Sequence, residues 1–254
     1  MMLVVIGDLI DDVIVIGAYT IERGTDNAAQ ISHTRGGSAA NVAAAAASLV
    51  STRFIGKVGS DATGDALARA LGRGGVDVRV QQEGRTGSIV ILVDETGERT
   101  MLTDRGAAAE LGPIDASWLD AATWLHVPLY GLVPERSREA ITAAIDALPT
   151  TPRSLDLSSV SAMRELGVEA LTEVLAGIRP DLVFANADEA ALLREMGASA
   201  AGGVLIVKDG ADPVRIVTPG GTIEIPVPAS TRSSTRPGPA MPSPPATSPR
   251  LWTD

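Results

Sequence analysis

The strongest constraint on the fold of this chain is the alternation of short apolar runs with helical segments in its second half. Each apolar run has the length of a strand, and each segment between two runs has the length and pattern of a helix. An alternation of this kind predicts a mostly parallel sheet with helices on both faces, and therefore an α/β fold. The predicted helices and strands alternate at 115–122, 123–127, 134–147, 153–157, 161–176, 181–185, 187–196 and 203–208.

The N-terminal half departs from this alternation. The hairpin pattern SIVILV-DETGE-RTML and the segment 11–35 lack the intervening helices that a parallel sheet requires. We expect them to form a small β-sheet lid set on the main sheet, built from about 11–35 and 78–106. The strands predicted in this half lie at 3–6, 13–16, 88–93 and 99–102, and a strand followed by a turn is predicted at 54–59.

Composition excludes several classes of function. The formal net charge of −10 argues against a nucleic-acid surface or an anionic-membrane surface, because both need a basic patch. The absence of cysteine excludes disulfides and thiolate chemistry, and His33 and His126 lie too far apart to have metal-ligand spacing. No targeting segment or membrane-length apolar stretch is visible, which predicts a cytoplasmic protein.

One group of candidate ligand contacts lies near the N-terminus. Gly36 and Gly37 form a tight turn before an Ala-rich helix, where paired glycines allow close approach of a ligand. Asn41 can both donate and accept hydrogen bonds, as a polyol requires. Asp12 follows the first predicted strand, at the edge where open α/β sheets bind ligands. The structural alternative is a small-residue packing turn with solvated acids.

A second group of candidates follows the later predicted strands. Asn186 and Glu189 have the spacing of a capping box, and the alternative is that they organise phosphate and Mg²⁺ through water. Lys208 and Gly210 end the strand at 203–208, where a lysine could meet a phosphate or simply face solvent.

The order and spacing of these motifs resemble the ribokinase (PfkB) family of carbohydrate kinases. The resemblance covers about residues 3–228 and implies a Rossmann-like, ribokinase-like domain at 1–228 with a β-sheet lid. The segments that carry it are GDLIDD, GGSAANVA, FIGKVGSDATGDALARALGRGGVDV, RTGSIVILVDETGERTMLTDRGAA, NADE and IVKDG.

The resemblance also implies an activity, which is ATP-dependent, Mg²⁺-assisted phosphorylation of a sugar or nucleoside hydroxyl. It assigns substrate contacts to Asp12, Gly36, Gly37 and Asn41, and it suggests a homodimer that pairs through the lid. A dinucleotide-dependent oxidoreductase is disfavoured, because Gly7 is not followed by a G-x-G-x-x-G pattern. The resemblance places the nucleotide near Asn186, Glu189, Lys208 and Gly210, with Glu189 acting on the metal through water.

The catalytic loop that the resemblance implies is missing from the sequence. The family has a motif like D-T-T-G-A-G-D-A-F, whose last Asp is the general base and whose glycines form an anion hole. It would follow IPVPA closely, but residues 229–254 carry 6 of the 16 prolines and show no apolar period. The composition of this aberrant tail predicts that it is disordered. The sequence therefore lacks the motif that carries the catalytic Asp. The alternative function is that of a non-catalytic sugar-binding remnant.

A shift of reading frame explains the tail. The codons of residues 234–243 begin TC, AC, CG, CC, GG, CC, GC, AT, CC and TC, as their amino acids permit. When the third base of each codon is read together with the first two bases of the next codon, the shifted frame can encode D-T-T-G-A-G-D-A-F. The same reading continues through Pro249 as A-A-G-Y-L-A. We infer the loss of one base, or the gain of two, near the codons for 226–233.

Reading the codons for residues 220–254 again from genomic DNA decides between two outcomes. An intact locus would make the tail an artefact and would continue the protein into a complete catalytic loop. A locus that reproduces the printed frame would mean that the protein is a truncated relic.

Overall fold

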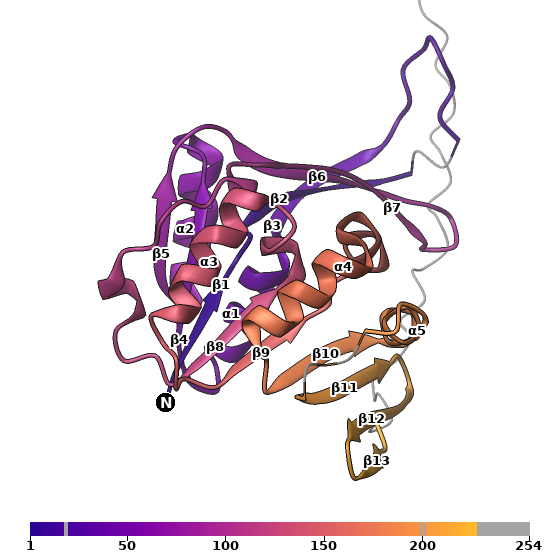
Figure 1. Ribbon diagram of the computed structural model, residues 1–254. Helices are drawn as coiled ribbons and strands as arrows, with labels where there is room; N and C mark the ends of the chain where they lie inside the picture. The colour runs from indigo at the N-terminus through magenta and orange to yellow at the C-terminus, as the bar shows by residue number, and fades with distance from the viewer. Residues whose placement is uncertain (18–19, 199, 201, 228–254) are drawn as a thin grey trace, which may run out of the picture.

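The computed structural model describes residues 1–17, 20–198, 200 and 202–227. Its centre is a twisted sheet with helices on both sides, joined to a second, smaller sheet (Figure 1). In the described residues the main sheet has nine strands in the order β13-β12-β11-β10-β9-β8-β1-β4-β5. In chain order they are β1 (Met2–Ile6), β4 (Ser51–Val58), β5 (Asp77–Gln82), β8 (Trp124–Pro128), β9 (Arg153–Asp156), β10 (Leu182–Asn186), β11 (Val204–Asp209), β12 (Asp212–Thr218) and β13 (Gly221–Ile225).

The pairing confirms the α/β prediction. In the main sheet, the seven neighbouring strands β11, β10, β9, β8, β1, β4 and β5 pair in parallel. Strands β12 and β13 add an antiparallel hairpin at one edge. The sequence analysis did not predict strands β12 and β13, because the short apolar runs in this region lack the flanking helix that marks the other strands. The carboxyl ends of all the parallel strands lie at one edge of the sheet, so residues that follow them gather there.

Two separate apolar clusters attach the helices to opposite faces of the sheet. On one face, α1 (Ser38–Ala46) and α2 (Ala62–Arg73) pack on β1, β4 and β5 around Val5 and Phe54. On the other face, α3 (Glu135–Asp146), α4 (Val160–Ile178) and α5 (Ala187–Glu195) pack on residues such as Leu125 and Val183. Most members of both clusters are aliphatic, as the low aromatic content requires.

The second sheet contains most of the residues that were predicted to form a lid, and we call it the lid sheet; its strands pair in the order β3-β2-β6-β7. These strands are β2 (Ile10–Ile16), β3 (Gln30–Gly36), β6 (Thr86–Val93) and β7 (Arg99–Gly106). The predicted lid boundary at 78 was wrong. Strand β5 belongs to the main sheet, where it pairs with β4, and its Val78 and Val80 pack on the α1–α2 cluster.

Two further predictions are corrected. Residues 115–122 do not form an α-helix but contain a short 3₁₀-helix, Ala116–Leu119, which begins where the Asp115 carboxylate accepts a hydrogen bond from the Ser117 amide. Asp12 lies inside lid strand β2 and not in a loop after the first strand. The predicted tail at 229–254 lies outside the described residues. In the part of the chain that is described, no helix has both the length and the apolar character needed to cross a membrane.

Asp61 joins the lid to the main domain. It caps α2 by accepting a hydrogen bond from the Gly64 amide (2.8 Å), and it also accepts bonds from the Thr86 amide (2.7 Å) and hydroxyl (2.6 Å) at the start of β6. The hydrogen bond from the Thr86 hydroxyl is the largest cause that lowers the pKa of Asp61 below its ordinary value. The stability that Asp61 provides is therefore present above about pH 4 and is lost as the pH falls through the lowered pKa.

We expect Asp61→Ala to lower the free energy of unfolding by about 1–3 kcal/mol at pH 7, because three donors lose their acceptor. Urea unfolding measures the difference in the free energy of unfolding between the variant and the parent protein. We expect this difference to become smaller at acidic pH. Asp146→Ala, at an exposed position on α3, is the matched control and leaves stability nearly unchanged. Equal effects of the two substitutions would contradict the bridging role of Asp61.

Candidate active site

The first part of the site is the start of α1, which lies directly against the chain that follows β1. Gly37 has φ 98°, and a Cβ there would lie 2.4 Å from the backbone oxygen of Asp8, so this contact requires glycine. The Asp8 carboxylate accepts a hydrogen bond from the Ala39 amide (3.1 Å), and its backbone oxygen accepts one from the Ala40 amide (3.2 Å). Asp8 is buried, and it helps to anchor the helix N-terminus.

Asp12 reaches the same place from the lid. A Cβ on Gly36 would lie 2.0 Å from Asp12 Oδ1, so the carboxylate occupies the space that a side chain at position 36 would need. Asp12 Oδ1 is buried and has no hydrogen-bond partner within the described residues. Burial is the main cause that raises the pKa of Asp12, with Asp8 and Asp11 adding to it. A buried acceptor of this kind suits a ligand hydroxyl.

Two lid arginines that the sequence analysis did not identify complete this group. Arg35 Nη1 donates a hydrogen bond to Asn41 Oδ1 (2.9 Å), which fixes the orientation of the amide. The guanidinium of Arg105 lies 4.1 Å from the centre of the Tyr130 ring and 3.6 Å from Asp8 Oδ2. The sequence carried a weak signal for these two arginines, because each immediately precedes the glycine that ends a lid strand. A basic side chain before glycine is common, so this signal did not identify them.

The second part of the site lies at the start of α5, where the capping box is confirmed. The Asn186 side chain accepts a hydrogen bond from the Glu189 amide (2.8 Å), and Glu189 accepts bonds from the Asn186 backbone (2.8 Å) and side-chain (2.9 Å) nitrogens. Glu189 is buried, and burial is the main cause that raises its pKa. Both oxygens of the Glu189 carboxylate are therefore engaged by Asn186 in the cap.

Lys208 stands beside this box. It is in register with Asn186 on the neighbouring strand, and its Nζ lies 3.2 Å from Asp156 Oδ2 at the end of β9. The side chain of Lys208 is 54% exposed, so the ammonium is both paired and open to solvent. Gly210, with φ 58°, makes the turn between β11 and β12. Asp156 was not predicted, because SLDLSS carries no motif.

The structure therefore brings the predicted residues together in two groups on one edge of the sheet. Asp12, Gly36, Gly37 and Asn41 gather beside the end of β1, and Asn186, Glu189, Lys208 and Gly210 gather at the ends of β10 and β11. Strands β8 and β9 lie between the two groups. Within the described residues, no three His, Cys, Asp or Glu side chains cluster as a metal site.

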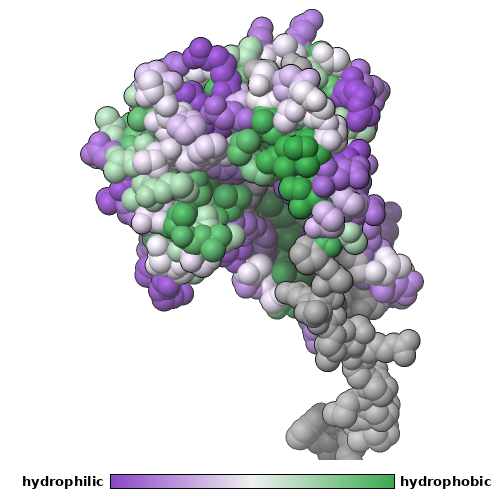
Figure 2. Space-filling model, turned by 90° about the horizontal axis from the view of Figure 1, so that it is seen from below, coloured by the Kyte–Doolittle hydropathy of each residue, from purple (hydrophilic) through white to green (hydrophobic). Residues whose placement is uncertain are grey.

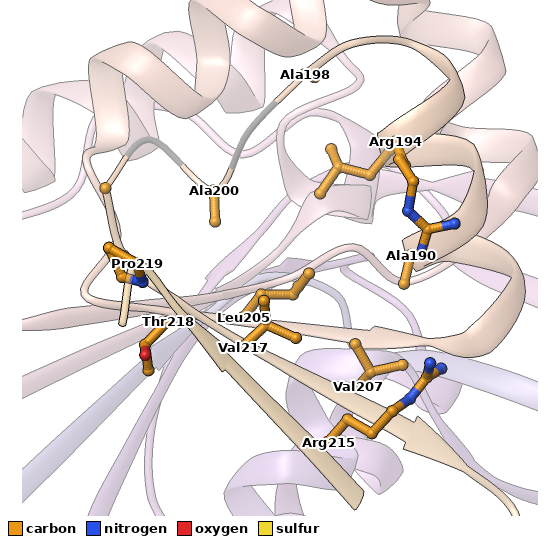
Figure 3. Close-up of a pocket in the computed structure, with 13 residues that line it drawn as sticks. Ala190, Arg194, Ala198, Ala200, Leu205, Val207, Arg215, Val217, Thr218 and Pro219 are labelled. Carbon is orange, nitrogen blue, oxygen red and sulfur yellow. The ribbon is translucent and has the colours of Figure 1, made fainter. Parts of the chain in front are cut away.

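A pocket of about 350 Å³ is lined by residues of α5, of β11 and of β12. Its lining is mostly apolar, with Arg194 and Arg215 at one side and Thr218 and Pro219 at the other (Figure 3). The sequence analysis did not anticipate this pocket, because it depends on the unpredicted hairpin β12–β13.

Comparisons with known proteins identify the family and the fold. The family model described as pfkB family carbohydrate kinase matches residues 1–235. The ATP-dependent ribose-1-phosphate kinase of Halopiger xanaduensis is 34% identical over 196 residues, which cover 74% of this chain and 63% of that protein. The chain thus spans less than two thirds of the length of this curated relative.

Solved structures show the same fold. The adenosine kinase from Sinorhizobium meliloti superposes with a TM-score of 0.76 at 23% identity, covering 90% of this chain and 80% of that one. The fructokinase from Xylella fastidiosa, solved with bound ATP, superposes with a TM-score of 0.72 at 21% identity, covering 89% and 77%.

We expect Asp12→Asn to raise the melting temperature at pH 7. The raised pKa means that ionising Asp12 costs stability as the pH rises above 3.8, the ordinary value, so a neutral amide relieves that cost. The gain shrinks as the pH falls toward 3.8, which thermal unfolding at several pH values measures. Asp120→Asn, at an exposed position, is the control. A destabilised Asp12→Asn variant at pH 7 would contradict the assignment.

Proposed function

This chain belongs to the pfkB family of carbohydrate kinases, and we propose that the complete protein transfers the γ-phosphoryl group of ATP to a hydroxyl of a sugar or nucleoside. The observation that carries the proposal is the buried, unpartnered Oδ1 of Asp12 beside the paired glycines at the start of α1. An acceptor of this kind is satisfied by a ligand hydroxyl, and Asn41 adds an amide that Arg35 orients on the first turns of α1.

The nucleotide side of the proposal rests on the second group of residues. The N-terminus of α5, Lys208 and the turn at Gly210 offer backbone amides and one cation to phosphate oxygens. Mg²⁺, when bound, neutralises charge on the phosphates. Asn186 and Glu189 would orient it through water, since Mg²⁺ keeps much of its hydration shell.

Catalysis needs two further elements, which we assign to the inferred frame. Positioning and electrostatics supply most of the rate in phosphoryl transfer. The hydroxyl must still lose its proton, and the D-T-T-G-A-G-D-A-F motif would provide the base and the anion hole. In the printed sequence these positions read STRPGPAMPS, outside the described residues.

The acceptor that we favour is a sugar that carries a phosphate or another anionic group. Arg35 and Arg105 bring two guanidinium groups from the lid close to Asp8 and Asn41, where they compensate the acids and also offer donors to an anionic group on the ligand. Tyr130 already stacks under Arg105, which disfavours its use as a platform for a nucleobase. The Halopiger relative, whose name specifies a sugar phosphate, agrees with this choice.

We also propose that two copies pair through the lid. Its strands β3 and β7 carry large apolar side chains that are more than half exposed, and such side chains favour burial against a partner. They are Ile31, Met101 and Leu102.

We expect the purified 254-residue chain to bind ribose 1-phosphate in calorimetry but to release no ADP from ATP. The chain with the frame restored should turn over, because a missing general base alone costs about 10²–10⁴-fold in rate. Arg105→Met should weaken binding of the sugar phosphate more than that of ribose, whereas Arg73→Met, at the exposed end of α2, should change neither.

Each result has a distinct meaning. Turnover by the printed chain would overturn the assignment of the base to the inferred frame. Sugar binding without turnover in the frame-restored chain would favour the alternative, a non-catalytic sugar-binding protein. Equal binding of ribose and its phosphate would exclude the anionic acceptor.

A further inference from the structure

The pocket in Figure 3 lies where the main sheet extends past the last described helix on one of its faces. Helix α5 packs on β10 and β11, and strand β12 continues the sheet beyond β11. The step between α5 and β12 leaves the pocket of about 350 Å³. A cavity of this size is within the range of small-molecule binding sites.

The floor and one wall of this pocket are apolar. Leu205 and Val207, two residues apart on β11, point to the same face as α5, whose Leu193 forms the wall. Val217 lies directly opposite Leu205 in the pairing of β11 with β12, so its side chain points to this face too. Leu205 and Val217 stay partly exposed. The apolar body of a ligand would remove this surface from water.

Two guanidinium groups stand at one end of the pocket. Arg194 comes from the last turn of α5, and Arg215 comes from the middle of β12. Thr218 and Pro219 lie at the opposite end (Figure 3). Arg194 is exposed, and the Asp209 carboxylate is 4.0 Å from Arg215 Nη2, at the outer limit of an ion pair. Both cations are therefore open to an anion that enters the pocket.

We propose that this pocket binds a small carboxylic acid with an unbranched apolar body. The carboxylate lies between the guanidinium groups of Arg194 and Arg215, which present paired donors to it. The apolar body lies along Leu205 and Val217. Arg215 and Thr218 are three residues apart on β12, which corresponds to about 10 Å and suits a straight chain of about eight carbon atoms. Octanoate is therefore the probe that matches the pocket.

The acids nearby favour a single negative charge on the ligand. Asp209 lies beside Arg215, and Glu224 is opposite Arg215 in the pairing of β12 with β13. A dianionic phosphate would be repelled by both acids, whereas a carboxylate brings one charge to two cations. We therefore expect octanoate to bind more tightly than octyl phosphate at pH 8.

The pocket is separate from the candidate active site, although both use α5 and β11. Successive side chains of a strand point to opposite faces, so Lys208 points away from the pocket that Val207 helps to form. Asn186 precedes the first turn of α5, whereas Arg194 lies in the last turn. The inference does not rest on the proposed function.

Other apolar surface competes for an amphiphilic ligand. Seen from below, hydrophobic residues gather around a hollow of the molecular surface (Figure 2). A second cavity, of about 430 Å³, has Leu3, Val42 and Lys208 in its lining. The experiment must therefore distinguish the pocket beside α5 from this second cavity.

The first test is calorimetric titration of the 254-residue chain with octanoate at pH 8. We expect one saturable site, and we expect Arg194→Met and Arg215→Met each to weaken binding about tenfold, because each removes a charge-assisted contact. Octanol, which lacks the charge, should bind more weakly than octanoate. Lys208→Met is the matched control, because it removes the cation of the second cavity, and it should leave the affinity for octanoate unchanged.

The outcomes of the titration decide the proposal. Equal binding of octanoate and octanol, or unchanged affinity in both arginine variants, would overturn it. The absence of saturable binding would do the same. Tighter binding of octyl phosphate than of octanoate would overturn the assignment of a carboxylate.

Methyl NMR of the unsubstituted chain locates the ligand without any variant. We expect octanoate to shift the methyl signals of Leu193, Leu205 and Val217 and to leave those of Leu3 and Val42 in place. Shifts confined to Leu3 and Val42 would place octanoate in the second cavity and would contradict the proposal.

Discussion

The close approach of α1 to the chain after β1 is the constraint on which the candidate site depends. Gly37 allows backbone contact that a Cβ would block, and Asp8 holds the first amides of the helix. Because of this contact, a helix N-terminus, the carboxyl end of a central strand and the base of the lid meet at one point. Asp12 enters the same point from β2, which is possible only because position 36 is glycine.

The charges at this point explain how the lid and the main domain are coupled. Asp8 serves structure, whereas Asp12 has a buried oxygen without a partner and a raised pKa. Arg35 and Arg105, both on lid strands, compensate these acids and contact Asn41 and Tyr130 of the main domain. A ligand hydroxyl that satisfies Asp12 would lie where β2 of the second sheet meets the start of α1.

The second group of site residues depends on the order of the strands in the main sheet. Asp156, Asn186 and Lys208 stand at or beside the ends of the neighbouring strands β9, β10 and β11. Lys208 pairs with Asp156 across β10 and lies in register with Asn186. Parallel pairing therefore gathers one cation, one carboxylate and the capped start of α5 at one edge of the sheet.

The sequence by itself determined the α/β alternation, the presence of a second sheet and the capping box of Asn186 and Glu189, because these follow from local pattern and spacing. It misplaced the start of the lid, because the sequence of β5 suits a strand of either sheet. Only its pairing with β4 places it in the main sheet. It also missed Arg35, Arg105 and Asp156. Their roles come from partners distant in the chain, such as Asp156 with Lys208, and only tertiary packing decides which partners meet.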